Sequence, residues 1–495
     1  MHLRNLQLCA LFLAALYGCD RRQASQGADS SAPSDSRTSD GQVLDARASC
    51  TSCSLLVDHF ARTLGAGRDP DDSSFASAVA IGANQQIFVA GGFRGRLEID
   101  GLTASSANGG SAFIVALSSQ GKAQWLSVPT SSARMRRVAL TASASGELYV
   151  AGGSDGAIRF GQHALDQGGG FLARLDEQGG FRWALGLGGA DEARIEAVAT
   201  DVSGAALVAG WFVGTSVVFG KSVVEAPRAG THAFVAKVRP DGLPLWTLVG
   251  VGDYLGARAF SVASAGDGAI YVTGNAWAGV SFGARRVSAV GENHAFLLKI
   301  SRDGDPLWLR PIARRIGSGD GHCPLAAQLG SSVVLGGYFN GPAKLGTTSL
   351  SGHIESEDAF LAGFGSDGAE RWALAFGSAL GRETVSSVAV AEQGALTYAV
   401  GTFEQPLPLG QLQLRSNGAS DGWLVLLNSS GALIEARALG GQGHDGLAAI
   451  DARARQVAVV GTLNSVATIG GQTLGEAQFS RALVWVFERK KQQDD

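Results

Sequence analysis

Residues 365–372 read Gly-Ser-Asp-Gly-Ala-Glu-Arg-Trp and contain the unit Gly-x-x-x-Trp, from which the prediction of the fold starts. The unit recurs along the chain, and its tryptophans are 58, 63, 62 and 64 residues apart. Its copies are Gly121/Trp125, Gly179/Trp183, Gly242/Trp246, Gly304/Trp308 and Gly368/Trp372. Two positions fit the spacing without a tryptophan: Phe60 lies 65 residues before Trp125, and Glu435 lies 63 residues after Trp372. A fixed period of this length indicates a repeat architecture.

Three more segments recur between these units. One is short and apolar, such as 76–81; the next ends in glycine, as in 87–91; the third begins with an aromatic residue or Leu, as in 113–117. All are four to seven residues long, rich in Val, Ile, Leu and aromatic residues, and bounded by Gly, Asp and Ser, which is typical of strands. Turns such as Arg302-Asp303-Gly304 hold the glycine that a tight hairpin needs.

Four strands in each repeat of about 62 residues predict an all-β fold, a β-propeller with four antiparallel strands per blade. Each of the four segments occurs seven times, but the copy around Phe60 comes first and the chain ends after a third strand, 483–487. We therefore expect seven blades over residues 54–490, with the ring closed by the N-terminal strand in the last blade, so that no sheet edge stays open. The repeat gives a structural role to Phe60, Trp125, Trp183, Trp246, Trp308 and Trp372.

The same region resembles a family of bacterial β-propeller repeat proteins that are often exported or lipid-anchored. The family pattern is an Asp-Ala-Phe start, a turn with Gly, and then Trp. It stands here as Asp358-Ala359-Phe360 with Gly368 and Trp372, and as His294-Ala295-Phe296 with Gly304 and Trp308. The resemblance implies the propeller fold and no particular activity, because propellers host many functions.

The N-terminus has the features of an export signal. Arg4 precedes a mostly apolar run, 6–16, which as a helix would span about 16 Å and is too short for a bilayer core of about 30 Å. Leu16-Tyr17-Gly18-Cys19 resembles the lipobox of bacterial lipoproteins, although Tyr17 departs from the pattern. The resemblance implies a signal peptide at 1–18 and lipidation of Cys19; an ordinary secretory signal is the alternative.

Residues 19–53 are polar and lack aromatic residues, which predicts a disordered, lipid-anchored tether. The tether ends in a CxxC pair, Cys50 and Cys53, for which an exported chain favours a disulfide. A redox motif would need a βαβ context, and a zinc site would need two more ligands. Asp20 leaves the choice between inner and outer membrane open, and residues 491–495 form a polar tail.

Composition narrows the class of partner. With 45% hydrophobic and 17% charged residues the chain can bury a large core, although 70 of its 495 residues are glycine. A formal net charge of −4 leaves no basic surplus for holding phosphates, so we expect no nucleic-acid partner.

Three enzymatic interpretations compete with a binding role. The Gly-x-x-x-Trp unit resembles the docking repeat of quinoprotein dehydrogenases, but the vicinal cysteine pair of those enzymes is missing, and they have eight blades. The turn 301–304 resembles the Asp-box of sialidases, with the wrong distance from Gly to Trp. For a metal-dependent lyase or lactonase, ligands could stand two residues before the third-strand aromatic, at Ser111, Gly169, His232, His294, Asp358, Asp421 and Arg481. Adjacent blades would hold these positions more than about 10 Å apart, so we interpret them as turn caps.

The sequence thus favours a non-catalytic protein of the cell envelope that binds protein or glycan on one propeller rim. We expect it to be a monomer with no cofactor and no bound metal, held at the membrane by its lipid. The alternative is a hydrolase or lyase with a site at the channel mouth, and a purely structural role in envelope assembly comes third. Trp211 and Trp277 could stack on a sugar ring, but filling the interface between blades is the favoured interpretation.

Overall fold

The computed structural model describes residues 41–42 and 54–490, apart from 66–68, 70–71, 107–109, 132, 254–255, 315–324, 328–332, 392–395, 470 and 477–478. These residues form strands, turns and bends and no helix, which confirms the all-β prediction. Accordingly, they contain no helix long and apolar enough to cross a membrane. The predicted signal peptide, Cys19, Cys50, Cys53 and the tail 491–495 lie outside the described residues.

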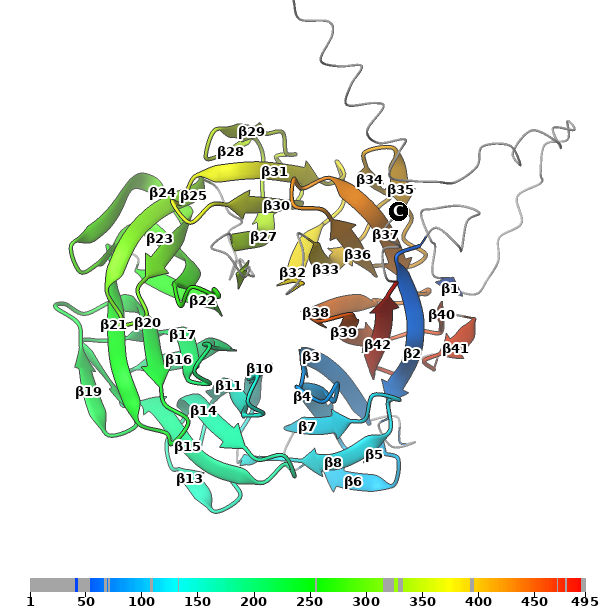
Figure 1. Cartoon of the computed structure of the whole chain (residues 1–495), viewed down its shortest axis with the longest axis horizontal. Coiled ribbons are helices and arrows are strands. Elements are labelled where there is room, and N and C mark those ends of the chain that lie inside the picture. The colour runs from blue at the N-terminus through cyan, green and yellow to red at the C-terminus, as the bar shows by residue number, and fades with distance from the viewer. Residues whose placement is uncertain are drawn as a thin grey trace, which may run out of the picture.

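The sheets consist of four-stranded antiparallel units arranged around a common centre (Figure 1). We name each unit after its innermost strand. The first units are β3 (Ser73–Ile81), β4 (Ile87–Arg94), β7 (Ser111–Leu117) and β8 (Ala123–Ser127); β10 (Met135–Ala142), β11 (Leu148–Ser154), β14 (Gly169–Leu175) and β15 (Phe181–Gly188); and β16 (Glu192–Thr200), β17 (Ala206–Val213), β20 (Thr231–Val238) and β21 (Pro244–Gly252). Within each unit, consecutive strands pair with one another, as the sequence pattern predicts.

The remaining units continue in chain order. They are β22 (Ala257–Ser264), β23 (Ile270–Phe282), β24 (Arg285–Ile300) and β25 (Pro306–Arg314); β26 (Leu325–Ala327), β27 (Val333–Phe339), β30 (Asp358–Phe364) and β31 (Glu370–Phe376); β32 (Thr384–Val390), β33 (Thr397–Phe403), β36 (Asp421–Leu427) and β37 (Leu433–Leu439); and β38 (Gly446–Arg453), β39 (Gln456–Leu463), β42 (Arg481–Arg489) and β2 (Leu56–Leu64).

The β38 unit takes its outermost strand from the opposite end of the chain. Strand β2 pairs antiparallel with β42, with Phe60 opposite Val486 and Ala61 opposite Trp485 (Figure 1). The predicted pairing of the Phe60 segment with the last strand is therefore confirmed. The pairing covers the backbone groups of β42 that a sheet edge would otherwise expose.

Short hairpins extend from the units between the second and third strands. They are β5 (Arg96–Ile99) and β6 (Leu102–Ser105), β12 (Ile158–Phe160) and β13 (His163–Leu165), β18 (Ser216–Phe219) and β19 (Ser222–Glu225), β28 (Ala343–Leu345) and β29 (Thr348–Leu350), β34 (Leu407–Leu409) and β35 (Leu412–Leu414), and β40 (Ala467–Ile469) and β41 (Gln472–Leu474). An apolar side chain before the turn is buried in each case, such as Phe160 and Phe219. It fixes the hairpin to its unit.

One short strand is described within residues 19–53. Gly41 and Gln42 form β1 (Gly41–Gln42), which pairs in parallel with Ala467 and Thr468 of β40. The physical reason is that the outer edge of a hairpin offers unpaired backbone groups to any nearby segment of chain.

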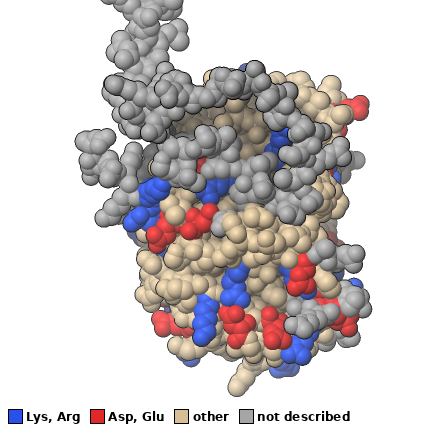
Figure 2. All heavy atoms as spheres, turned by 90° about the vertical axis from the view of Figure 1, so that its right-hand side faces the viewer, with Lys and Arg blue, Asp and Glu red and all other residues tan. Residues whose placement is uncertain are grey.

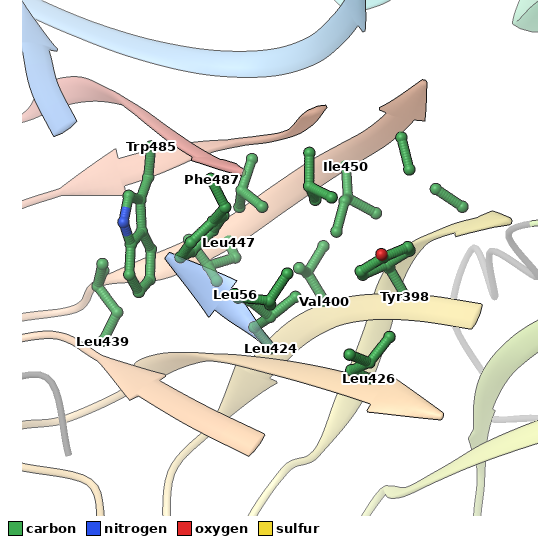
Figure 3. Close-up of a cluster of buried hydrophobic side chains, with 14 of the residues drawn as sticks. Leu56, Tyr398, Val400, Leu424, Leu426, Leu439, Leu447, Ile450, Trp485 and Phe487 are labelled. Carbon is green, nitrogen blue, oxygen red and sulfur yellow. The ribbon is translucent and has the colours of Figure 1, made fainter. Parts of the chain in front are cut away.

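The hydrophobic core lies between neighbouring units. Each buried cluster joins side chains of two units that follow one another around the centre. In the cluster of Figure 3, Leu56, Trp485 and Phe487 of the β38 unit lie with Tyr398 and Leu424 of the β32 unit. Another cluster joins the β38 unit to the β3 unit, so the two ends of the chain share a core. Burying one such large side chain contributes about 1.5–3 kcal/mol.

Candidate binding surface and central cavity

A cavity of about 350 Å³ lies at the centre, lined by β3, β10, β16, β22, β32 and β38. Most of its lining side chains are Ala, Val, Ser and Thr, and the charged ones are Arg137, Glu196 and Asp451. Asp451 Oδ2 accepts a hydrogen bond from Ile81 N at 2.7 Å, which joins β38 to β3 across the cavity wall.

The polar positions before the third strands serve the turns beside them. Asp358 accepts hydrogen bonds from His353 N at 2.5 Å, and Asp421 accepts one from Asn417 N at 2.5 Å. His232 Nε2 lies 2.9 Å from the carbonyl oxygen of Arg228. These three side chains behave as the predicted turn caps. Across the described ranges, no three His, Cys, Asp or Glu side chains are grouped in a way that could hold a metal ion.

Two buried carboxyl groups have strongly shifted pKa values. Glu383 is 0% exposed, and its carboxylate accepts hydrogen bonds from Ser378 N and Ser378 Oγ at 3.0 and 2.8 Å. Burial raises the pKa of Glu383 to about 7, although these hydrogen bonds oppose the shift. Burial also raises the pKa of Asp421 to about 6, and the nearby Asp445 adds to it.

Arginine and aromatic side chains gather at the beginning of the inner strands β3 to β22. The Trp211 ring, only 3% exposed, lies 4.2 Å from the Arg258 guanidinium and 5.4 Å from that of Arg194. Its Nε1 donates to Glu196 Oε1 at 2.9 Å. The Arg258 guanidinium also lies 5.9 Å from the centre of the Trp277 ring. Trp211 is thus buried as expected, but guanidinium groups stack on its ring.

More arginine and aromatic side chains line two neighbouring pockets. One pocket of about 250 Å³ lies between the β10 and β16 units, and its charged lining side chains are two arginines and three carboxylates, Arg136, Arg194, Asp155, Asp191 and Glu192. The other, of about 260 Å³, lies between the β3 and β10 units, and we call it the Phe75 pocket. It shares Arg136 with the first. We call the whole series the basic-aromatic arc; its members are Phe75, Arg94, Arg134, Arg136, Arg194, Trp211, Arg258 and Trp277.

The arc covers only part of the circumference. In the β16 unit the pair next to Ile195 and Gly210 on the inner ladder is Arg194 opposite Trp211. The corresponding pairs are Thr384 opposite Thr402 in the β32 unit and Gly446 opposite Thr462 in the β38 unit. On the outer wall around β2, β40 and β41, acidic and basic side chains are interspersed (Figure 2). The β3 to β22 side of the molecule thus carries arginine and aromatic side chains at positions where the β32 and β38 units have Thr or Gly.

The repeat tryptophans share one contact that the sequence did not predict. Each lies against the turn glycine of the next unit, as Trp125 does against Gly179 and Trp183 against Gly242. Four of their indole Nε1 groups also donate to a carbonyl oxygen of that turn, at 2.8 to 3.3 Å; the four are Trp125, Trp183, Trp246 and Trp308. Phe60 contacts Gly121 in the same way. Within one unit, the turn glycine therefore contacts the preceding unit, and the tryptophan contacts the following unit.

Glu435, the exception to the repeat, makes a different contact. In the β38 unit, β42 and β2 are not joined by a turn, so no turn glycine can pack against the side chain at position 435 of β37. The Glu435 carboxylate instead accepts hydrogen bonds from Ser54 Oγ at 2.7 Å and from Leu55 N at 3.0 Å. Arg437 donates to Glu435 Oε1 at 2.9 Å and to Ser54 Oγ at 2.8 Å. The side chains of Arg437 and Glu435 are 7% and 2% exposed. The sequence had signalled this site only as a missing tryptophan.

Comparisons with known proteins give remote similarities. No protein-family model matches the chain, and no curated protein matches it. A protein of unknown function from Dyadobacter fermentans has a TM-score of 0.40 and 11% identity, over 88% of this chain and 100% of its own. One from Bacteroides caccae has a TM-score of 0.25 and 11% identity, over 52% and 94%. Exo-inulinase from Aspergillus awamori has a TM-score of 0.27 and 8% identity, over 89% and 100%. At these TM-scores the similarities carry no argument about function.

Proposed function

We propose that the four-stranded units form a seven-bladed β-propeller and that its rim binds a glycan or a protein of the bacterial cell envelope, without catalysis. Two observations support the fold. Buried clusters join each unit to the next, including the β38 unit to the β3 unit, and β2 completes the last unit from the other end of the chain. A ring of this kind gives a rigid support for surface side chains.

The observation that carries the binding function is the basic-aromatic arc. Arginine, tryptophan and phenylalanine are the residue types over-represented at binding surfaces, because they combine a large contact area with few mobile bonds or with several hydrogen-bond donors. Phe75 is 49% exposed, and Arg94 and Arg134 are exposed beside it. At the positions that match Arg194 and Trp211, the β32 unit has Thr384 and Thr402 and the β38 unit has Gly446 and Thr462. The arc is thus a local feature and not a requirement of the repeat.

A pair of charge-reversal variants tests the rim as the binding surface. The full chain is applied to a glycan array and to envelope extracts, in parallel with Arg94→Glu/Arg134→Glu. The matched control, Arg159→Glu/Lys221→Glu, makes the same charge change at exposed residues of the outer hairpins. We expect the rim variant to lose the ligands of the wild type and the control to keep them. Equal binding by all three proteins would overturn the proposal, and cleavage of a bound glycan would replace it by the hydrolase or lyase alternative.

Envelope attachment through Cys19 is a separate part of the proposal. Acyl chains contribute about 0.8 kcal/mol per buried CH₂, so a lipidated Cys19 would hold the domain at a membrane. Cys19→Ser should move the protein from the membrane fraction to the soluble fraction, while leaving its urea unfolding midpoint unchanged. A variant that still sediments with membranes contradicts lipid anchoring.

A further inference from the structure

The Phe75 pocket has a charge pattern that differs from that of the whole chain. The chain has a net charge of −4, but the charged side chains that line this pocket are Arg94, Arg134 and Arg136. Arg136 has a carboxylate partner, since its Nε lies 2.7 Å from Asp155 Oδ1. Among the described residues, no hydrogen bond or ion pair engages the guanidinium of Arg94 or Arg134. An arginine keeps its charge at every physiological pH, so two cations face this pocket without an anion.

Beside these cations lies an exposed aromatic ring. Phe75 is 49% exposed, although its strand neighbours Ser74 and Ala76 are buried at 0% and 1%. Phe75 pairs with Gly92, and a methyl group on Gly92 would lie 2.5 Å from the Phe75 ring. The ring therefore lies on bare backbone, with no side chain beneath it. Such a ring is a flat platform whose face carries partial negative charge and attracts polarised C–H groups.

The size of the pocket limits what it can hold. Its volume is about 260 Å³, and glycines 91, 92 and 110 contribute no side chain to fill it. Pockets for drug-sized ligands begin at about 300 Å³, so this one has room for a single ring. The ring must carry an anion for Arg94 and Arg134 and an apolar face for Phe75. A sugar ring with a carboxylate or phosphate group meets both needs.

We propose that the Phe75 pocket binds one acidic sugar unit, with its anionic group on Arg94 and Arg134 and its ring stacked on Phe75. This inference rests on the proposed glycan-binding rim and names the chemistry of one position on it. Guanidinium groups bind carboxylates and phosphates through paired, charge-assisted hydrogen bonds. Binding should therefore weaken as salt is added, because these cations are exposed to solvent.

Calorimetric titration of the full chain with defined sugars tests the pocket. The probes are an oligosaccharide of galacturonic acid, a neutral oligosaccharide of equal length, a sugar phosphate and inorganic phosphate. We expect the acidic oligosaccharide to bind at least about tenfold more tightly than the neutral one, as loss of a charged hydrogen bond implies. The sugar phosphate distinguishes a phosphate preference from a carboxylate preference. If inorganic phosphate binds as tightly as either acidic sugar, the ring is not recognised and the inference is wrong.

Variants locate the binding to this pocket. Phe75→Ala and Arg134→Gln should each weaken binding of the acidic sugar by about tenfold or more, with Arg94→Gln as a second charge variant. The matched controls are Leu245→Ala, which removes a side chain that is 51% exposed, and Arg159→Gln on an outer hairpin. Equal urea midpoints establish that each variant is folded. Unchanged affinity in all three pocket variants would overturn the inference. If the acidic sugar fails but a different ligand from the array or extract still loses binding in Arg94→Glu/Arg134→Glu, the proposed binding function stands and only the acidic-sugar inference is wrong.

Discussion

Glu435 illustrates how one substitution within a repeat can follow from the position of the chain ends. At this position five units have tryptophan, which needs a turn glycine in the next unit. The β38 unit offers no such turn, because its outer strand β2 begins there. The free backbone N–H groups at the start of β2 require an acceptor, and Leu55 N finds one in the Glu435 carboxylate. A buried carboxylate with a paired Arg437 is the result.

Removing this carboxylate should destabilise the fold strongly. Within the described residues, Glu435→Ala leaves the buried Arg437 with Asp58, which is 37% exposed, as its ionic partner. We expect a loss of about 3 kcal/mol in the free energy of unfolding, measured in urea, as for other broken buried pairs. Glu435→Trp restores the residue of the repeat and should fail to recover stability, because no glycine turn faces it.

The control for this prediction is an exposed ion pair. Glu98 pairs with Arg96, and both side chains are more than half exposed, so Glu98→Ala should cost less than about 1 kcal/mol. Equal effects of Glu435→Ala and Glu98→Ala would show that the buried pair does not hold β2.

A second residue makes the stability of the protein depend on pH. The pKa of Glu383 is raised to about 7 in the folded protein, from an ordinary value of 4.5. Between these two values the unfolded chain releases the proton while the folded protein keeps it. The stabilisation is therefore complete below pH 4.5 and is lost as pH rises toward 7.

Glu383→Gln should remove this pH dependence, because an amide does not titrate. Between pH 5 and pH 7 the free energy of unfolding of the wild type, measured in urea, should fall by an amount on the order of 2 kcal/mol through this group. The free energy of unfolding of Glu383→Gln should lack this fall. Glu98→Gln, at an exposed carboxylate, should keep it. A wild type and a Glu383→Gln variant that respond alike to pH would contradict the raised pKa.

At the scale of the element, the turn between third and fourth strands carries two requirements at once. Its glycine adopts a positive φ, +81° at Gly179, which side chains rarely tolerate. The same glycine must also leave room for the tryptophan of the preceding unit, since a Cβ at Gly179 would lie 2.5 Å from the Trp125 ring. The sequence signals the need for a positive φ, because the glycine stands in a recognisable turn. The need for space beside the tryptophan arises only when two units pack together.

The two requirements can be separated by a pair of alanine substitutions. Gly410 also has a positive φ, +65°, but a Cβ there meets nothing within 4 Å. Gly410→Ala should therefore cost only the backbone strain, about 1–2 kcal/mol, whereas Gly179→Ala should cost clearly more. The measurement is urea unfolding of both variants. Equal losses would mean that the Trp125 contact adds nothing to the stability of the turn.

At the scale of the molecule, the first and last long strands of the described residues, β2 and β42, lie side by side. The antiparallel pairing of β2 with β42 and the buried pair at Glu435 hold residues 54–64 against the last units. Without β2, the Trp485 strand would become an exposed apolar edge, which favours aggregation.

Removal of β2 should therefore make the protein aggregate, and β2 supplied separately should rescue it. A chain that begins at residue 66 is expected to be insoluble, and a peptide of residues 54–65 should restore solubility and the near-ultraviolet circular dichroism of the whole protein. A chain that begins at residue 54 is the control and should behave as the wild type. A soluble, natively folded chain from residue 66 would refute the role given to β2.

Most of the strands were predictable, because alternating apolar residues, turn glycines and a fixed period are local signals. The pairing of the Phe60 segment with the Trp485 strand also followed, since the leftover strand and the incomplete last repeat were complementary. The binding surface was harder to predict. Arg94, Arg134 and Phe75 occupy positions that vary between repeats, and nothing in their local sequence says that they face one pocket.

The sequence by itself determined that this chain is all-β, repetitive and joined at its ends, because strand propensity and repeat spacing act over a few dozen residues. Only the tertiary structure decided which side chains meet across units. Ser54 and Glu435 are 381 residues apart in the chain, yet they share a hydrogen bond. The Arg258 guanidinium likewise lies against the Trp211 ring of the preceding unit. Such contacts depend on how whole sheets pack against one another, and sheet packing is a property that no single repeat contains.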